Sequence, residues 1–322
     1  MAKCDLAAAY EDDSIAWVYC PSFAAAVLFA VLFGLSTVTH IIQAIRFRKR
    51  FCWVIIMAGL WETSGFTVRS YSARQFRGLG HFIPQQLLII LAPIWTNAFV
   101  YMVAGRMIHF LVPEKKIFGI GARRLTLLFV VLDMFAFLIQ GSSSSLMSSD
   151  DSESVRIGIK IYMVGVGVQE AFIVLFIVLA GRFQYRMTQE EFVRPIPHRW
   201  RRLLYTLYIA LGLITVRIIF RLVEYPNGEY SHVARHEAYF YCLEALPMVA
   251  SLVMFNAIHP ALVLIGPDSE FPKKVKKSRA ERKADKENKK AQGNYSLTTG
   301  ARNGVDGFGS GSGSGMDIEM RV

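Results

Sequence analysis

Hydrophobic residues are gathered into long runs, and short polar or charged segments separate one run from the next. A helix of about 20 apolar residues spans the hydrocarbon core of a bilayer, and seven runs reach that length. They cover approximately residues 21–45, 51–70, 84–108, 124–141, 157–181, 202–222 and 238–264. The pattern predicts an all-α polytopic membrane protein, whose residues 21–265 form a bundle of seven transmembrane helices.

The distribution of charge predicts the orientation of this bundle. The 322 residues include 36 Lys or Arg and 25 Asp or Glu, which gives a net charge of +11. Basic residues gather in the first, third and fifth connections, whereas acidic residues gather in residues 1–20 and in the other connections. Because cytoplasmic loops carry the excess of Lys and Arg, we expect the N-terminus outside and the C-terminus in the cytoplasm. The alternation also favours a membrane topology over a nucleic-acid-binding surface.

Residues 266–322 have the composition of a disordered cytoplasmic tail. The stretch FPKKVKKSRAERKADKENKK is too highly charged to form a packed core, and a Gly/Ser-rich end follows it. Its basic residues would lie beside the inner leaflet, where each one attracts anionic lipid by about 1 kcal/mol. Anionic inner-leaflet lipid is therefore an expected partner, and a merely solubilising tail is the alternative.

The cysteines Cys4, Cys20, Cys52 and Cys242 form no CxxC or metal-type spacing. Residues 1–20 are expected to be an extracellular N-terminal segment, which places Cys4 and Cys20 outside the membrane. A disulfide between these two is one alternative, and four free thiols are the other.

One apolar run carries charge in an unexpected place. The stretch FCWVIIMAGLWETSGFTVRSY contains Glu62 near its middle and Arg69 near its end. A charge at the centre of a transmembrane helix costs about 2.5–3.5 kcal/mol on insertion scales, and it is retained where it faces a bundle interior, a partner or water. Residues seven apart lie on one face of a helix. We therefore expect Glu62 and Arg69 to face the interior together.

Other runs also carry polar residues, and together they define a candidate substrate-binding site. Acids near the middle of the membrane would pair with arginines in its outer half, and all of them would line one water-accessible cavity. Interhelical salt bridges that only fix the packing are the alternative. The candidate residues are Glu62, Arg69, Asp133, Gln140, Gln169, Glu170, Arg217, Arg221 and Glu244.

Histidines offer a different chemistry. His40, His109 and His259 fall at the same inner level of the predicted bundle, and a metal or haem site there remains an alternative. Topology argues against a zinc hydrolase that combines His40 with His232 and His236, because His40 would lie on the opposite side of the membrane from the other two. The sequence has no phosphate-binding GxxxxGK[ST] loop. We expect no catalytic residue, metal or cofactor, and hence no enzyme.

Two prolines suggest an internal repeat. Pro93 and Pro247 each lie near the middle of a predicted span, the third and the seventh. A 3+1+3 arrangement of two parallel repeats would give this match and the odd number of spans. A coincidence of two prolines is the alternative.

Taken in order, these motifs resemble the fungal lipid-translocating exporter family, the RTA-like proteins. The resemblance covers about residues 17–262 and every predicted span. The stretches that carry it are Tyr19-Cys-Pro-Ser22, His40 with Arg46-Phe-Arg48, Glu62-Thr-Ser-Gly65 with Arg69, Leu91-Ala-Pro93, Gly105-Arg106, Asp133 with Gln140-Gly141, Gly165-Val-Gly-Val-Gln169-Glu170, Arg217 with Arg221 and Glu224, and His236-Glu237 through Glu244, Pro247 and His259-Pro260.

The resemblance implies a plasma-membrane transporter of lipids or other amphiphiles. Its substrate would be a sphingoid base, a phospholipid or a sterol-like toxicant, and its export would confer resistance. A cationic sphingoid amine would pair with the buried acids. A seven-helix receptor or lipid sensor is the alternative, and a haem- or porphyrin-handling protein is a more remote one. The oligomeric state stays open.

Overall fold

The computed structural model of the chain describes residues 17, 19–74, 79–147, 149, 151–193, 199–224, 235–264 and 266. Cys4, most of the expected extracellular segment and the expected tail from residue 267 onward lie outside the described residues.

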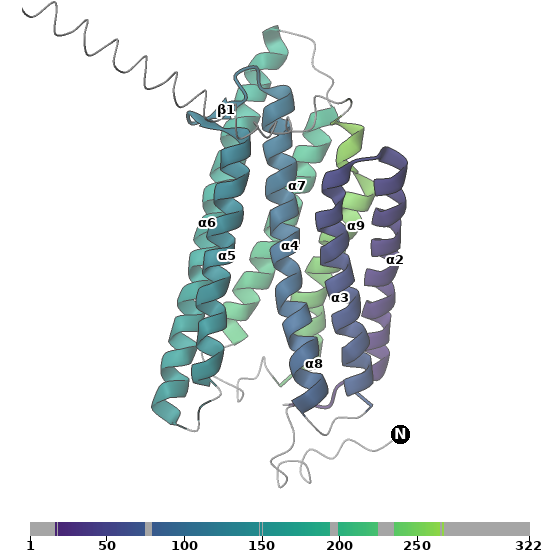
Figure 1. The fold of residues 1–322 in the computed structure, drawn as a ribbon, viewed down its shortest axis with the longest axis vertical. Coiled ribbons are helices and arrows are strands. Elements are labelled where there is room, and N and C mark those ends of the chain that lie inside the picture. Colours follow the sequence, from purple (N-terminus) through teal and green to yellow (C-terminus); the bar gives the residue numbers. More distant parts are fainter. Residues whose placement is uncertain are drawn as a thin grey trace, which may run out of the picture. The chain divides into compact units, whose positions relative to one another are not determined.

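Seven long apolar helical segments run side by side in the described part of the chain, which confirms the predicted seven-helix bundle (Figure 1). The first six are α2 (Phe23–Phe47), α3 (Trp53–Ser72), α4 (Leu79–Leu111), α5 (Ala122–Met147), α6 (Ser152–Val193) and α7 (Arg199–Glu224). The seventh is built from α8 (Glu237–Tyr239), the π-helical segment η3 (Phe240–Ala245), α9 (Leu246–Ala257) and the short turn η4 (Pro260–Leu262).

Helix α6 extends furthest beyond its predicted limits, to Val193 instead of residue 181. The apolar run stops near Arg182, but good helix formers such as Gln, Glu, Arg and Met continue the helix past it. Hydropathy therefore indicates which part of a helix can lie in lipid, whereas helix propensity determines how far the helix continues beyond that part.

The bundle has two ends, which we name by their elements. The N-side end carries the start of α2 and α8 and the C-terminal end of α7, and the opposite end carries the hairpin between α4 and α5 (Figure 1). This hairpin pairs β1 (Lys116–Ile117) with β2 (Ile120–Gly121) and is a small addition to the all-α prediction.

Glycines let neighbouring helices approach closely. A Cβ atom at Gly59 of α3 would overlap Thr37 of α2, and one at Gly105 of α4 would overlap Thr126 of α5. Without a hydrophobic force between helices in lipid, such close van der Waals contacts are a main source of helix association.

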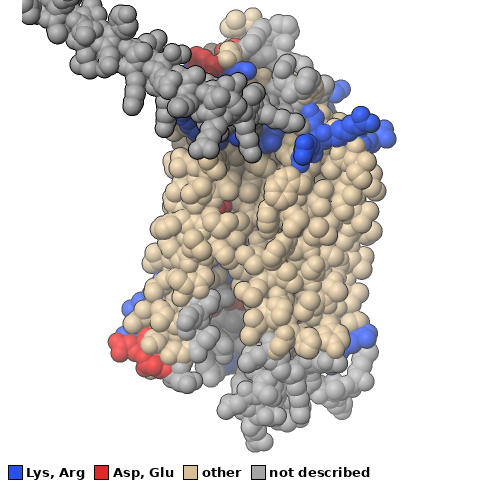
Figure 2. Space-filling model, in the orientation of Figure 1, with Lys and Arg blue, Asp and Glu red and all other residues tan. Residues whose placement is uncertain are grey.

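The outer surface between the two ends is apolar. Large hydrophobic side chains such as Leu35, Leu138 and Val164 are more than half exposed. Figure 2 shows this surface as a broad band without Lys or Arg, with charged residues gathered at its two borders. An apolar band around a bundle is the surface expected for contact with lipid chains.

The repeat suggested by two prolines stays a prediction. Pro93 lies inside the continuous helix α4, whereas Pro247 lies in the first turn of α9, directly after a π-helical segment. The two prolines thus have different local structures.

The structure shows the state of three of the four cysteines. Cys20 is disulfide-bonded, while Cys52 and Cys242 are not. The alternative of four free cysteines is therefore wrong, and Cys4, the partner named in the other alternative, lies outside the described residues.

Candidate functional site

The most highly charged part of the interior joins α7 to η3. Arg221 donates two hydrogen bonds to Glu244, from Nε to Oε2 at 2.8 Å and from Nη2 to Oε1 at 2.7 Å. Arg217 adds an ion pair to the same Oε1 at 2.7 Å, and Arg221 also contacts Glu224 at 3.3 Å. Glu244, Arg221 and Arg217 are only 1%, 4% and 7% exposed. We call these four residues the charged centre.

Local structure explains how these side chains meet. Arg217 and Arg221 are one helical turn apart, so they project from one face of α7. Glu244 belongs to the π-helical segment η3 and lies three residues before Pro247. Because proline has no N–H, a regular α-helical hydrogen-bond ladder cannot run through this turn. Single π-helical turns of this kind frequently occur at functional sites.

Glu62 of α3 lies beside the charged centre. Its side chain is buried, and its Oε2 has no hydrogen-bond partner among the described residues. Arg217, Glu244 and Arg221 are the charged groups that act on it electrostatically. The structure therefore brings four of the predicted site residues together, Glu62, Arg217, Arg221 and Glu244.

Arg69 is buried on the same side of α3 as Glu62, as predicted, but its partners are at the N-side end. Its Nε donates to the hydroxyl of Tyr241 at 3.1 Å, and its Nη2 donates to the hydroxyl of Tyr19 at 2.7 Å. The same nitrogen forms an ion pair with Glu237 at 3.3 Å. The expectation that Arg69 pairs with an acid near the middle of the membrane is therefore wrong.

Aromatic rings complete the surroundings of Arg69. Its guanidinium carbon lies 4.3 Å from the ring centre of Phe240 and 4.8 Å from that of Trp17. Cation–π contacts of this kind stabilise a desolvated arginine. Burial raises the pKa of Tyr19, and Arg69 partly offsets this effect. Tyr19 therefore keeps its proton near neutral pH, and its oxygen accepts the hydrogen bond.

The other two acids have neutral partners. Asp133 of α5 accepts hydrogen bonds from Asn97 at 2.8 Å and Tyr101 at 3.1 Å, both on α4. Glu170 of α6 accepts one from Thr215 of α7 at 3.0 Å. The prediction that arginines pair with every midplane acid is wrong for Asp133 and Glu170 in the described part of the chain. One oxygen of each carboxylate is buried without a hydrogen-bond partner there.

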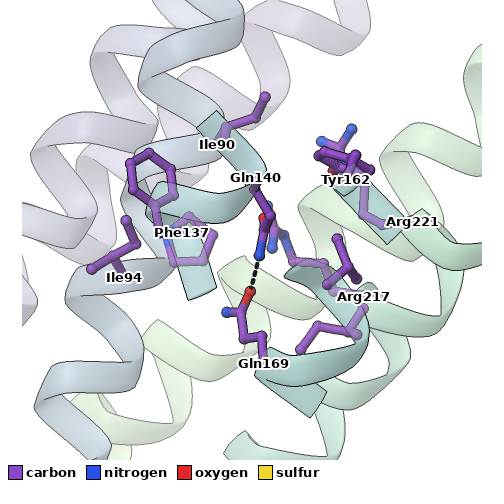
Figure 3. A pocket seen from close by; sticks show the side chains of 11 residues that line it. Ile90, Ile94, Phe137, Gln140, Tyr162, Gln169, Arg217 and Arg221 are labelled. Atoms are coloured by element: carbon purple, nitrogen blue, oxygen red, sulfur yellow. Dashed lines mark hydrogen bonds between the residues drawn. The ribbon is translucent and has the colours of Figure 1, made fainter. Parts of the chain in front are cut away.

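A small pocket lies between α4, α5, α6 and α7 and reaches the charged centre (Figure 3). Its free volume is about 20 Å³, which is room for about one water molecule. Across it, Gln140 donates a hydrogen bond of 2.9 Å to Gln169. The lining residues are Ile90, Pro93, Ile94, Phe137, Gln140, Tyr162, Val166, Gln169, Arg217, Ile218 and Arg221.

Several residues of these networks were not among the candidates. Tyr19, Glu237 and Tyr241 hold Arg69, and Tyr101 holds Asp133. Tyrosines are common at the ends of transmembrane helices for other reasons, so their sequence positions carry no specific signal. A contact between residues about 170 positions apart cannot be read from spacing.

Two of the three histidines expected at the inner level, His40 and His259, make structural contacts. His40 Nε2 is 3.1 Å from the carbonyl of Leu252, and His259 Nδ1 accepts a hydrogen bond from the amide of Ala261. His259 Nε2 is 3.5 Å from Sγ of Cys52. In the described ranges, no group of three or more His, Cys, Asp or Glu side chains is placed to hold a metal. The structure thus gives no support to the alternative of a histidine metal site.

Comparisons with known proteins point to one group. A family model described as "RTA1 like protein" matches residues 55–266. The chain is 42% identical over 274 residues to the probable lipid transporter atnI of Emericella nidulans, covering 81% of this chain and 72% of that protein. It is 27% identical over 282 residues to protoporphyrin uptake protein 1 of Saccharomyces cerevisiae, covering 76% and 92%. It is 22% identical over 308 residues to the sphingoid long-chain base transporter RSB1 of the same species, covering 83% and 79%. No solved structure matches significantly.

Proposed function

This chain belongs to the RTA1-like protein family, and from that premise we propose that it transports an amphipathic lipid across a membrane. Two of its relatives are named as a lipid transporter and a sphingoid long-chain base transporter. A third is named for protoporphyrin uptake, another large amphipathic molecule. These names support an amphiphile as the substrate.

The observation that carries the proposal is the charged centre inside a bundle with an apolar outer band. Packing seven helices in lipid does not require a buried cluster of two arginines and their acids, and such groups usually mark a substrate or ion pathway. Buried polar atoms of Glu62, Asp133 and Glu170 also have no hydrogen-bond partner among the described residues. Water or a polar headgroup would satisfy them.

The candidate residues would then serve in different places along the path. Glu62, Arg217, Arg221 and Glu244 would form its charged middle, with Gln140 and Gln169 beside them. Asp133 and Glu170 would offer acceptors further along α5 and α6, and Arg69 would hold the N-side end. A sphingoid base, a phospholipid or a sterol-like toxicant is the proposed substrate class.

We further propose that the N-side end faces the outside of the plasma membrane and that the chain is not an enzyme. The positive-inside rule supports this orientation, because Arg46, Arg48, Lys49 and Arg50 lie at the opposite end. The basic tail would then lie beside anionic inner-leaflet lipid. The transporter names of the relatives support a function without catalysis.

A liposome assay tests the transport proposal. The purified full-length protein is reconstituted, and the movement of a fluorescent sphingoid base and a fluorescent phospholipid is followed in separate samples. Wild type is compared with Glu62→Gln, which removes the charge but keeps the shape. The exposed Glu153 at the start of α6 provides the matched control, Glu153→Gln.

We expect wild type and Glu153→Gln to move at least one lipid, and Glu62→Gln to move it much more slowly. Equal rates in all three proteins would remove Glu62 from the path. Saturable binding without movement of either lipid would overturn transport and favour a lipid sensor instead.

A further inference from the structure

The pocket beside the charged centre has a marked chemical bias. Two arginines line it, Arg217 and Arg221, and no aspartate or glutamate among the described residues does. Its other polar side chains are Gln140, Gln169 and Tyr162. In Figure 3, Gln140 and Gln169 face each other across it, and both arginines approach from α7. The lining therefore favours a ligand that accepts hydrogen bonds and carries negative charge.

Arg217 has donors to spare. A guanidinium carries five N–H groups. Its Nη2 is used by Glu244 at 2.7 Å, while its Nε is buried and has no hydrogen-bond partner among the described residues. Arg221, by contrast, donates to both Glu244 and Glu224. The pocket thus contains one cation that is only partly satisfied.

The nearby acids do not cancel this bias. Glu244 is shared between both arginines, and Glu224 forms an ion pair with Arg221. Glu62 acts on Arg217 electrostatically, but no hydrogen bond or ion pair joins these two in the described part of the chain. None of these three acids lines the pocket. Glu224 and Glu244 therefore bind the arginines without lining the pocket.

The remaining walls suit the rest of a lipid headgroup. Ile90, Ile94, Phe137 and Ile218 present apolar atoms around the arginines. A site with a few polar groups set in apolar walls is typical of small-molecule binding. Guanidinium pairs with phosphate in strong, charge-assisted hydrogen bonds. An amine would find no carboxylate in the lining.

We propose that this pocket binds the phosphate of a lipid headgroup. The inference rests on the proposed lipid transport and narrows its substrate class from a free sphingoid amine to a phosphorylated lipid. The free volume of about 20 Å³ fits water, not a phosphate. The headgroup therefore enters by separating Gln140 from Gln169, and their amides then turn to the phosphate oxygens.

Binding to the full-length protein in a maltoside detergent, which contains no phosphate, tests the assignment. The probes are a fluorescent sphingoid base 1-phosphate, the same base without phosphate, and inorganic phosphate. We expect the phosphorylated base to bind about tenfold or more tightly than the unphosphorylated base, the scale of one charge-assisted contact. We expect inorganic phosphate to compete only weakly, because it lacks the apolar contacts.

The key variant is Gln169→Glu. A carboxylate at this position can still accept the hydrogen bond that Gln140 donates, so the fold is retained while a negative charge enters the pocket. It should weaken binding of the phosphorylated base about tenfold or more and leave the unphosphorylated base unaffected or bound more tightly. Arg217→Gln should also weaken the phosphorylated base, while Arg221 still holds Glu244. Arg123→Gln, at the exposed start of α5, is the control and should match wild type.

Equal binding of the two bases, or phosphate-dependent binding unchanged in both pocket variants, would overturn the assignment. Inorganic phosphate that binds as tightly as the phosphorylated base would assign the pocket to free phosphate and overturn the lipid source. The liposome assay separates this inference from the transport proposal. Movement of the unphosphorylated base without phosphate-dependent binding would overturn the phosphate assignment and support the transport proposal. Phosphate-dependent binding that is lost in Gln169→Glu, without movement of any lipid, would overturn the transport proposal and support the phosphate assignment.

Discussion

Arg221 and Glu244 meet through two parallel hydrogen bonds of 2.7 and 2.8 Å, inside a bundle whose outer surface is apolar. The residues lie on different helical segments, α7 and η3, so this pair ties the sixth span to the seventh. A two-pronged arginine–carboxylate contact fixes orientation as well as distance. It holds Arg217 in place through the shared oxygen of Glu244.

Removing the acid of this pair should be costly. Glu244→Gln replaces the carboxylate that two buried guanidinium groups share with a neutral amide. Breaking a buried ion pair from one side typically costs about 3–5 kcal/mol. We expect a large drop in the unfolding temperature of the detergent-solubilised protein. Glu114→Gln is the matched control, because its ion pair with Arg186 is largely exposed. Similar melting of both variants would show that the charged centre does not stabilise the bundle.

Glu237 should fasten the segment before α2. Its carboxylate accepts hydrogen bonds from the backbone N–H of Ser22 at 2.8 and 3.0 Å and pairs with Arg69. Glu237→Ala removes these contacts, and a typical hydrogen bond contributes about 0.5–1.5 kcal/mol net. We expect faster hydrogen exchange at the start of α2, measured by mass spectrometry, while the middle of α2 keeps its protection. Exchange rates equal to those of wild type and of Glu153→Ala would show that Glu237 does not hold this segment.

The close approach of α4 and α5 depends on a glycine. Gly105→Ala would drive its Cβ into Thr126, and overpacking of this kind typically costs about 1–3 kcal/mol. Gly181→Ala is the control, since a Cβ there meets open space and alanine favours the helix by up to about 1 kcal/mol. Thermal unfolding should therefore shift in opposite directions.

A second substitution checks the cause of the Gly105 effect. Thr126→Ala removes the hydroxyl with which the new Cβ collides, so the double variant should recover part of the lost stability. Effects of the two substitutions that simply add would exclude this contact as the cause.

The first turn of α6 should respond to acid. Asp151 accepts hydrogen bonds from the hydroxyl and backbone N–H of Ser154, and with Glu153 N–H they hold the pKa of this carboxyl below its ordinary value of 3.8. A lowered pKa in the folded state stabilises above the ordinary value, and this stabilisation is lost as the pH falls through the lowered one. Hydrogen exchange at Glu153 and Ser154 should therefore accelerate in strong acid.

Asp151→Asn provides the comparison for this prediction. Asparagine can cap the helix without a titratable group. Its exchange at the same amides should show no such acid-dependent step beyond the intrinsic pH dependence. A step of equal size in the variant would assign the effect to another group.

The amino-acid sequence by itself determined the number of spans and the burial of charged side chains such as Glu62 and Arg69 within one of them. Both depend on local properties, namely the length of an apolar run and the cost of a charge within it. Glu62 and Arg69 share a buried face because the helical repeat alone fixes that relation. The family resemblance was likewise carried by residues in order along the chain.

Only the tertiary structure decided which buried groups meet. Arg69 pairs with Tyr19, Tyr241 and Glu237 instead of a midplane acid, and Asp133 is held by Asn97 and Tyr101. These partners depend on how far each helix is rotated and shifted along its neighbours, which side-chain packing over the whole bundle sets. The π-helical turn at Glu244 changes that rotation within one span. No pattern along the chain contains these angles, so the charged centre and its pocket exist only in the folded protein.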